Sequence, residues 1–328
     1  MNLQILSNKV RLLAAVLLAG LIAGAAALSA CGREKEAPSG GEPSLVDPTG
    51  SRAPVPAKLE RIVSAAPSNT EIIAALGFAD KLIAIDTYSA SVEGISGTPV
   101  LIDFAYPDGE VILGLEPDIV FAAGHSRTVG GADPFTLVRE TGITVVYIPT
   151  SVSIADIYRD IRFIAEALGV PERGERLAAE MRGQIAGIAE TGAAIPDKRS
   201  VYFEISPFPG MVSFGRETYL NEMITLIGAV NIFAGETGWF SPSPEAILER
   251  NPDVILAMSD SANGPSEYPP DALLEEIRGR PGFETLNAVK TGRVYVIDAD
   301  SASRPSHHIV AALKQMARAV YPDRFPAF

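Results

Sequence analysis

The strongest constraint on the fold is an internal repeat. Counting from Pro107 in the first copy and Pro242 in the second, an offset of 135 residues, both copies place Pro, Glu, Ile, Leu, Pro, Asp and Ala at the same positions. Two more pairs of segments follow in the same order: Glu71–Gly77 with Glu222–Gly228, and Thr141-Gly142 with Thr291-Gly292. Three matches in register indicate a duplication, so we expect two related lobes.

Within each lobe, short apolar runs alternate with helical segments. Leu82–Ile85 and Asp118–Ala123 are apolar and bounded by turn residues, as strands buried on both faces of a parallel sheet are. Strands that alternate with helices of about ten residues are typical of parallel sheets. The sequence therefore predicts an α/β fold with two Rossmann-like lobes, each built on a central parallel sheet.

The first helix of the first lobe follows a turn at residues 67–70. We expect this helix to begin at Glu71, with Ser68 or Asn69 as its N-cap. Gly77 is expected to end it, because glycine readily adopts the left-handed conformation that closes a helix.

The ligand of such a protein is expected to bind between the lobes. In parallel α/β sheets, ligands lie beyond the carboxyl ends of the strands. We expect six loops to form this rim: 66–70, 86–91, 123–128, 205–216, 237–241 and 298–306.

The segment 153–192 has no counterpart in the repeat. Apolar residues recur at helical spacing from Ser153 to Leu168, and a second helical run extends from Glu172 to about Glu190. A helix of roughly 19 residues is about 28 Å long, enough to cross one lobe. We therefore predict a long rigid helix that joins an N-terminal lobe at 58–152 to a C-terminal lobe at 193–328.

Residues 1–30 are predicted to form a lipoprotein signal peptide. They contain no acidic residue, and Lys9 and Arg11 precede an apolar run from Leu12 to Ala27. That run of about 16 residues is short for a membrane span and typical of a signal peptide. Small residues come just before Cys31, a pattern that resembles the bacterial lipobox, in which the cysteine is lipidated. A buried thiol and a plain N-terminal membrane anchor are the alternatives.

Residues 31–57 are predicted to be a flexible tether. Gly, Pro, Ser and charged residues dominate this segment, and it shows no apolar periodicity, so it cannot bury enough surface to order itself. The sequence thus predicts a globular protein held by Cys31 at the extracytoplasmic, or periplasmic, face of a cell membrane.

Composition and motif content exclude several other classes of protein. The 328 residues include 40 acidic and 27 basic side chains, and a net charge of −13 argues against binding to nucleic acid. One cysteine cannot form an intramolecular disulfide, and with three histidines it cannot supply a Cys/His zinc cage. The chain contains no phosphate-binding loop, no G-x-S-x-G and no H-E-x-x-H. Two lobes without a recognisable nucleophile favour a binding protein over an enzyme.

Several motifs together resemble one family. They are the lipobox, the R-I-V-S-x-x-P-S-x-T-E start at Arg61, the paired E-x-I-L-x-x-x-P-D motifs at Glu110 and Glu245, and Arg304-Pro305. The set is similar to the ABC-transporter solute-binding proteins for ferric siderophores, haem and cobalamin, over about residues 58 to 325. The resemblance implies a monomer with no cofactor of its own, which holds a metal chelate between its lobes. It also implies delivery to an ABC permease dimer driven by a cytoplasmic ATPase.

The resemblance implies that Glu110 and Glu245 dock the protein to its permease. In the family, the matching glutamates meet arginines of the two permease subunits, one at the tip of each lobe. The alternative is that both are ordinary first-turn glutamates, which the helix dipole favours by about 0.3–1 kcal/mol each.

The candidate ligand contacts lie on the rim loops. The resemblance implies that Tyr88, Trp239 and Arg304 contact the chelate, because flat aromatic rings stack on macrocycles and arginine binds anionic groups. Arg127 and Arg216 can attract an anionic chelate, or can be ordinary surface arginines. The remaining candidates are residues of the same loops: Ser68, Asn69, Phe208 and Asp300.

The histidines are candidate metal ligands with a simpler alternative. His125 and His307 can each bind the iron or cobalt of a chelate as an axial ligand, from opposite lobes. His307 and His308 are adjacent and do not easily face one ion. Such histidines are more often helix-cap or surface residues. A site for free zinc or manganese, and a lipid-anchored enzyme on the same scaffold, remain alternative functions.

Overall fold

The computed structural model describes residues 44–127, 133–259 and 269–326. The predicted signal peptide, Cys31 and residues 31–43 of the predicted tether lie outside the described residues. Within these ranges, no helix combines the length and the apolar composition needed to span a bilayer.

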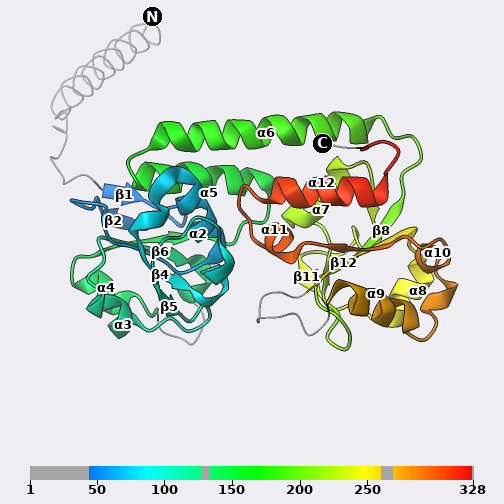
Figure 1. Ribbon diagram of the computed structural model, residues 1–328, viewed down its shortest axis with the longest axis horizontal. Coiled ribbons are helices and arrows are strands. Elements are labelled where there is room, and N and C mark those ends of the chain that lie inside the picture. The colour runs from blue at the N-terminus through cyan, green and yellow to red at the C-terminus, as the bar shows by residue number, and fades with distance from the viewer. Residues whose placement is uncertain (1–43, 128–132, 260–268, 327–328) are drawn as a thin grey trace, which may run out of the picture. The chain divides into compact units, whose positions relative to one another are not determined.

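The first lobe is a parallel sheet covered by helices on both faces (Figure 1). Its five strands lie in the order β5-β4-β3-β6-β7, and a short antiparallel hairpin, β1-β2, precedes them. The strands are β1 (Ser44–Val46), β2 (Arg52–Pro54), β3 (Ile62–Ser64), β4 (Leu82–Asp86), β5 (Val100–Ile102), β6 (Ile119–Ala123) and β7 (Thr144–Ile148). The helices are α2 (Pro67–Ile73), α3 (Gly109–Gly114) and α4 (Thr136–Glu140), with short π or 3-10 turns η1 (Ala74–Phe78), η2 (Ala79–Lys81), η3 (Thr87–Ser91) and η4 (Gly124–Arg127).

The second lobe repeats this plan with a four-stranded parallel sheet in the order β10-β8-β12-β13. The second lobe also contains a separate two-stranded antiparallel ribbon, which is formed by β9 and β11. The strands are β8 (Ser200–Glu204), β9 (Ser213–Phe214), β10 (Val230–Asn231), β11 (Trp239–Phe240), β12 (Val254–Met258) and β13 (Val294–Ile297). The helices are α7 (Tyr219–Leu226), α8 (Pro244–Arg250), α9 (Pro270–Gly279), α10 (Asn287–Lys290), α11 (Ala299–Ser303) and α12 (Ile309–Val320), with the 3-10 turn η5 (Phe283–Thr285).

The repeat in the sequence corresponds to equivalent elements of the two lobes. Strands β6 and β12 begin 135 residues apart, at Ile119 and Val254, and occupy the same place in their sheets. The aspartate of each Pro-Asp pair joins two strands: Asp118 accepts hydrogen bonds from backbone N–H groups just before β3, and Asp253 accepts one from Ser200 at the start of β8. The Pro-Asp pair therefore recurs for a structural reason, because it holds neighbouring parallel strands in register. The prediction of two α/β lobes is confirmed.

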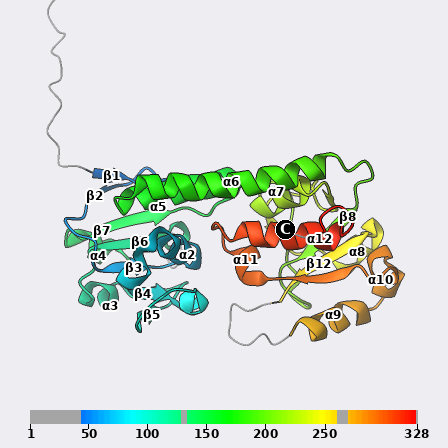
Figure 2. The same cartoon turned by 45° about the horizontal axis from the view of Figure 1, so that its top comes forward.

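Two helices join the lobes. Helix α5 (Ile154–Ala167) and helix α6 (Pro171–Ala193) lie side by side, and α6 continues across the second lobe, where it contacts α7 and α12 (Figures 1 and 2). Helix α6 has 23 residues, which corresponds to about 34 Å at 1.5 Å per residue. It is longer than the run from Glu172 to Glu190 that the sequence predicts, because Pro171 occupies its first turn, where proline is well tolerated, and the last turn continues to Ala193.

One apolar core runs through both lobes. A single cluster of buried side chains includes Ile62 of the first sheet, Ile164 of α5, Ile185 of α6, Val201 of the second sheet and Leu313 of α12. The opposite faces of the two sheets have their own clusters, beneath α3 and α4 in the first lobe and beneath α8 and α9 in the second. A continuous close-packed core resists large relative motion, so we expect the lobes to move little against each other.

The structure corrects the extent of the predicted tether. Residues 44–54 form the β1-β2 hairpin, which is bonded to β7 of the first lobe. The hydroxyl of Thr144 donates to the carbonyl of Pro54 at 3.0 Å, and Asp47 Oδ2 accepts the N–H of Tyr147 at 2.9 Å. The Gly, Pro and Ser content that indicated flexibility belongs here to a tight turn, with Gly50 at a φ of 83°.

The start of the first helix also differs from the prediction. Helix α2 begins at Pro67, and its N-cap is Ala66, which makes no side-chain cap. Ser68 and Asn69 are therefore residues of the first turn and cap nothing. Helix α2 itself ends at Ile73, and the π turn η1 continues it as far as Gly77. There the helical conformation breaks, as predicted, because the φ of 90° is left-handed.

We expect Asp47→Ala to destabilise the protein by about 1–3 kcal/mol, because it leaves the buried N–H of Tyr147 and two part-buried N–H groups of the turn without their acceptor. Asp47 Oδ1 accepts from the N–H groups of Thr49 and Ser51, at 2.9 and 3.0 Å, and Oδ2 holds Tyr147. Urea unfolding measures the change. The exposed Val55→Ala is the control and should change stability by no more than about 0.5 kcal/mol. Equal midpoints for both variants would show that the hairpin does not stabilise the lobe.

Candidate functional site

Two adjoining pockets lie between the lobes at the carboxyl ends of the strands. Their volumes are about 190 and 110 Å³. We refer to them together as the interlobe cleft, because they share four lining residues: Thr150, Ser151, Ser303 and Pro305. The cleft lies where the sequence predicts the ligand to bind, with walls that include residues of loops 66–70, 123–128, 205–216, 237–241 and 298–306.

The wall from the first lobe is formed by the start of α2, by Phe104 and by His125. Phe104 lies between two other rings, with its centroid 5.4 Å from that of Tyr88 and 4.7 Å from that of His125. Tyr88 thus supports Phe104, which itself lines the cleft. The three rings make a continuous aromatic surface at the rim of this lobe.

Asn69 places a hydrogen-bond donor in this wall. Its side chain is 1% exposed and lines the cleft together with Ser68. Among the described residues, the Nδ2 atom of Asn69 has no hydrogen-bond partner. A buried donor without a partner costs about 1–3 kcal/mol, which an acceptor on a ligand can recover.

The wall from the second lobe centres on Trp239, the only tryptophan of the chain. Strand β11 pairs Trp239 with Phe214 of β9, and the two rings pack edge to face at 5.8 Å. Phe214 is fully buried, whereas Trp239 is 48% exposed. The ribbon therefore holds the indole ring firmly on one edge and leaves much of its surface available to a ligand.

The rim of the first lobe is shaped by the close approach of two loops. Gly124 follows β6 and Pro149 follows β7, and a Cβ atom at position 124 would lie 2.8 Å from the Cα atom of Pro149. Only glycine fits there. This contact brings His125 and Thr150 to the same side of the cleft.

Arg304 links the two lobes beside the cleft. Its guanidinium donates from Nη1 to Glu71 Oε1 at 3.0 Å and from Nη2 to the carbonyl oxygen of Tyr88 at 3.0 Å. Asp300 pairs with the same guanidinium at 2.7 Å, and Ser306 donates its hydroxyl proton to the other oxygen of Glu71. Arg304 is 7% exposed. Burial raises the pKa of Glu71, and the hydrogen bonds from Ser306 and Arg304 oppose that rise.

The charge of Arg304 is therefore balanced within the protein. The sequence predicted a cleft arginine that contacts an anionic chelate. Arg304 does line the cleft, yet two carboxylates already pair with it. Asp300, predicted as a ligand contact, is one of these carboxylates and also accepts a hydrogen bond from Ser91 of the first lobe at 3.1 Å.

The other two predicted arginines have partners away from the cleft. Arg127 donates to the hydroxyls of Thr49 and Ser51 in the β1-β2 hairpin, and its guanidinium lies 5.0 Å from the centroid of the Tyr147 ring. Arg216 donates to the carbonyl oxygen of Gly235 at 2.8 Å. The structure gives both arginines a local role, so the predicted basic rim is not formed by them.

The two candidate metal-binding histidines lie in different pockets. His125 lines the interlobe cleft, whereas His307 lines a second interlobe pocket of about 560 Å³ together with His308 and Glu71. Burial, and to a smaller extent the charge of His308, lowers the pKa of His307 to about 4. In the described residues, no three His, Cys, Asp or Glu side chains gather closely enough to hold a metal ion. His125 and His307 thus line different pockets, and axial ligation of a chelated metal by either histidine stays a prediction.

Glu110 and Glu245 occupy matching positions. Each is exposed and is the second residue of its helix, in α3 and α8. Both helices cover the sheet faces that are turned away from α6 (Figure 1). Phe208, predicted as a ligand contact, instead lines a pocket beside Glu245.

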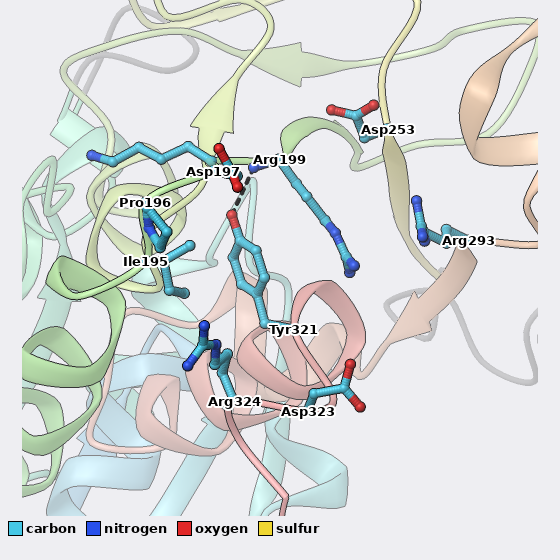
Figure 3. Close-up of a pocket in the computed structure, with 10 residues that line it drawn as sticks. Ile195, Pro196, Asp197, Arg199, Asp253, Arg293, Tyr321, Asp323 and Arg324 are labelled. Atoms are coloured by element: carbon cyan, nitrogen blue, oxygen red, sulfur yellow. Dashed lines mark hydrogen bonds between the residues drawn. The ribbon is translucent and has the colours of Figure 1, made fainter.

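A pocket of about 600 Å³ lies at the other end of the second sheet (Figure 3). Tyr321 stands at its centre, where its hydroxyl accepts the backbone N–H of Arg199 at 2.7 Å, and Arg293 and Asp253 form another part of the wall. Asp253 and Arg293 immediately precede strands β12 and β13, so this pocket faces the amino ends of the strands. Ligands of parallel sheets bind at the opposite ends, and this pocket is not our candidate.

Comparison with known proteins identifies the family. The family model described as periplasmic binding protein matches residues 62–301. The chain belongs to this family. The uncharacterized ABC transporter substrate-binding lipoprotein YvrC of Bacillus subtilis (strain 168) is 32% identical over 271 residues, which cover 81% of each chain.

Two further comparisons agree with this family. A vitamin B12-binding protein of Vibrio campbellii is 26% identical to our periplasmic binding protein, over 78% of this chain and 88% of its own. The solved structure of the periplasmic haem-binding protein RhuT from Roseiflexus sp. RS-1 is 25% identical, with a TM-score of 0.69, and the match covers 81% of this chain and 100% of that chain. Substrate-binding proteins of ABC importers act outside the cytoplasm and work with a membrane permease and an ATPase.

Two parts of the binding protein's cleft were not predicted from the sequence. Phe104 follows strand β5, which has only three residues and carries too weak an apolar pattern to be recognised. The loop 149–151 follows β7 and lines the cleft, but the predicted rim does not include it. The rule that ligands bind beyond the carboxyl ends of parallel strands, applied to β7, includes this loop.

Acidification should destabilise this periplasmic binding protein through His307. Burial lowers the pKa of His307 from 6.5 to about 4 in the native state. Between pH 6.5 and pH 4, His307 is therefore protonated in the unfolded chain and neutral in the native protein. The free energy of unfolding should therefore fall as the pH drops from 6.5 to 4, by about 2 kcal/mol at about pH 4.5. Urea unfolding of the wild type and of His307→Gln, each at pH 6.5 and at pH 4.5, measures the effect.

In that experiment, His307→Gln should flatten the pH dependence. His308→Gln is the matched control and should retain most of the wild-type loss, since the charge of His308 is the smaller of the two causes. An equal loss of stability in wild type and His307→Gln would contradict this assignment.

Proposed function

We propose that this protein is the extracytoplasmic solute-binding component of an ABC importer and that it captures a metal chelate between its lobes. The candidate chelates are cobalamin or another corrinoid, haem, and a ferric siderophore. The observation that carries the proposal is the interlobe cleft at the strand ends, where Phe104 of the first lobe lines one pocket and Trp239 of the second lobe lines the adjoining one. Membership in the periplasmic binding protein family supports it.

The cleft walls are suited to a large planar ligand. Phe104 and Trp239 can contact its two faces or edges, and aromatic contacts add about 0.5–1.5 kcal/mol each beyond the burial of area. Asn69 supplies the Nδ2 donor, which has no partner among the described residues, to an acceptor on the ligand. His125, which packs against Phe104, lines the same pocket and can contact the ligand through its imidazole ring.

The distribution of charge favours a corrinoid among the three candidates. The arginines predicted to attract an anion are bonded elsewhere, and Arg304 is balanced by Glu71 and Asp300. Recognition then depends on ring contacts and hydrogen bonds more than on charge. A corrinoid, whose side chains carry many amide groups, suits such a cleft better than a strongly anionic siderophore. The name of the Vibrio relative supports the same ligand class.

Delivery completes the proposed function. Glu110 and Glu245 dock the loaded protein to the permease, one on each lobe, and lipidated Cys31 holds the protein at the extracytoplasmic face of the membrane. Both glutamates are exposed and lie on different lobes, as a contact with two permease subunits requires. The protein releases its ligand unchanged and is not an enzyme.

The ligand class is tested by the fluorescence of Trp239. We expect cyanocobalamin to quench it with a submicromolar Kd, and haemin or ferric desferrioxamine to bind more weakly. Asn69→Ala should weaken binding by about tenfold, since it removes one buried donor. Exposed Thr225→Ala on α7 is the control and should leave the Kd unchanged. Absence of quenching by all three compounds, or recovery of a chemically altered chelate, would reject the proposal.

The docking role is tested by uptake. Glu110→Ala combined with Glu245→Ala should leave the ligand Kd unchanged and should abolish uptake by cells, because two interfacial charge pairs are lost. Glu140→Ala combined with Glu249→Ala removes the same charge from exposed sites on the same lobes and should leave uptake normal. Normal uptake by the first variant would show that these glutamates do not dock the permease.

A further inference from the structure

An apolar pocket opens directly beside Glu245. Its volume is about 560 Å³, and it lies between α8 and the end of α9. Its apolar walls are Phe208, Pro244, Leu248, Pro281 and Phe283. Phe208 is 50% exposed at the mouth, whereas Phe283 is fully buried at the floor. An aromatic ring left half in water above an open apolar pocket is typical of a surface that a partner covers.

In the described part of the chain, the one cationic side chain that lines the pocket is already paired within the protein. Arg280 is buried between two carboxylates: Nη1 and Nη2 donate to Glu204 at 2.6 and 2.8 Å, and Nε donates to Glu276 at 2.8 Å. The guanidinium also lies 5.4 Å from the centroid of the Phe283 ring. Two carboxylates on one cation leave one excess negative charge, so Arg280 is not available to bind an anionic partner.

The rim of the pocket is negative as well. The backbone N–H of Glu245 and the hydroxyl of Ser243 lower the pKa of the Glu245 carboxyl, which is therefore ionised at neutral pH. The pocket is apolar, and the Glu245 carboxylate at its rim is negative. A partner would fit this surface with an apolar side chain in the pocket and a cation against Glu245. The occupant should therefore be an apolar side chain with an arginine or lysine beside it.

The surface around Glu110 has the opposite shape. There, three apolar side chains project into solvent: Tyr106 (71% exposed), Val111 and Leu137. Val111 follows Glu110 in α3, and Leu137 belongs to α4, which packs against α3. The matching glutamates of the two lobes are thus bordered by a raised apolar surface on the first lobe and by a hollow one on the second.

We propose that the pocket beside Glu245 receives an apolar side chain of one permease subunit, while the other subunit accepts the raised surface beside Glu110. This inference rests on the proposed docking role of the two glutamates. The apolar contacts exclude water from each charge pair and so strengthen it. The two lobes then dock through unlike surfaces although their glutamates are equivalent.

Site-specific photo-cross-linking of the full-length lipoprotein in its own cells tests this contact. p-Benzoylphenylalanine at position 208, and separately at position 111, should cross-link to an ABC permease subunit identified by mass spectrometry. The same group at exposed Thr225 on α7, on the sheet face toward α6, should not. A permease cross-link from position 111 but none from 208 would overturn the pocket assignment alone, whereas none from either would also reject the docking role. Cross-linking of position 208 to a second copy of this chain would overturn the assignment too.

Substitution at the pocket mouth gives an independent readout. Phe208→Glu and Pro281→Glu should each lower uptake at least about tenfold, because a carboxylate placed against an apolar side chain of the permease loses its hydration without a compensating hydrogen bond. Thr225→Glu adds the same charge elsewhere and should leave uptake normal. Loss of uptake only in the Glu110 and Glu245 variants would overturn the pocket contact and leave the docking role standing. A change of the cyanocobalamin Kd in Phe208→Glu would assign Phe208 to the ligand site and overturn the inference.

Discussion

A buried ion pair between the lobes holds the cleft at one width. Arg304 of the second lobe lies against Glu71 of the first, and both side chains are almost completely removed from water. Removing two charges from water costs several kcal/mol each, and only close pairing with further hydrogen bonds offsets that cost. If the lobes separated, Arg304 and Glu71 would lose each other as partners, and this loss opposes the separation. The apolar cluster that continues through α5 and α6 adds the same restraint, so ligand contacts, cleft shape and docking geometry all depend on this junction.

A restrained cleft changes how binding and release must work. The walls are formed before the ligand arrives, so little of the binding free energy is spent on ordering loops or closing lobes. In the proposed function, release then depends on a partner that separates the walls by holding both lobes. In the docking that we propose, helices α3 and α8 are these attachment points, one on each lobe and both on the faces turned away from α6 (Figure 1). A force applied at α3 and α8 acts both on the ion pair between Arg304 and Glu71 and on helices α5 and α6.

The sequence predicted the fold well where local patterns carry the information. The repeat placed β6 and β12 correctly because Asp118 and Asp253 perform the same bonding task in each sheet. The site was predicted less well, since partners lie far apart in the chain. Nothing near Arg304 in the sequence shows that Glu71, 233 residues earlier, takes up its charge. Likewise, the composition of residues 44–54 indicates flexibility, and only the long-range bond from Tyr147 to Asp47 shows why the hairpin is ordered.

The duplication explains why the two exposed glutamates are equivalent, and its divergence explains why their surroundings are not. The repeated motif fixes where α3 and α8 begin relative to their sheets, so Glu110 and Glu245 follow from the motif. The motif contributes Val111 and Leu248 to the neighbouring apolar surfaces. The rest comes from segments outside it: Tyr106 and Leu137 in the first lobe, and Phe208, Pro281 and Phe283 in the second. Even a permease with two identical subunits would therefore meet one raised and one hollow surface. With identical subunits the two orientations of the docked protein are equivalent by symmetry, so the unlike lobes select one orientation only on a permease whose two subunits differ.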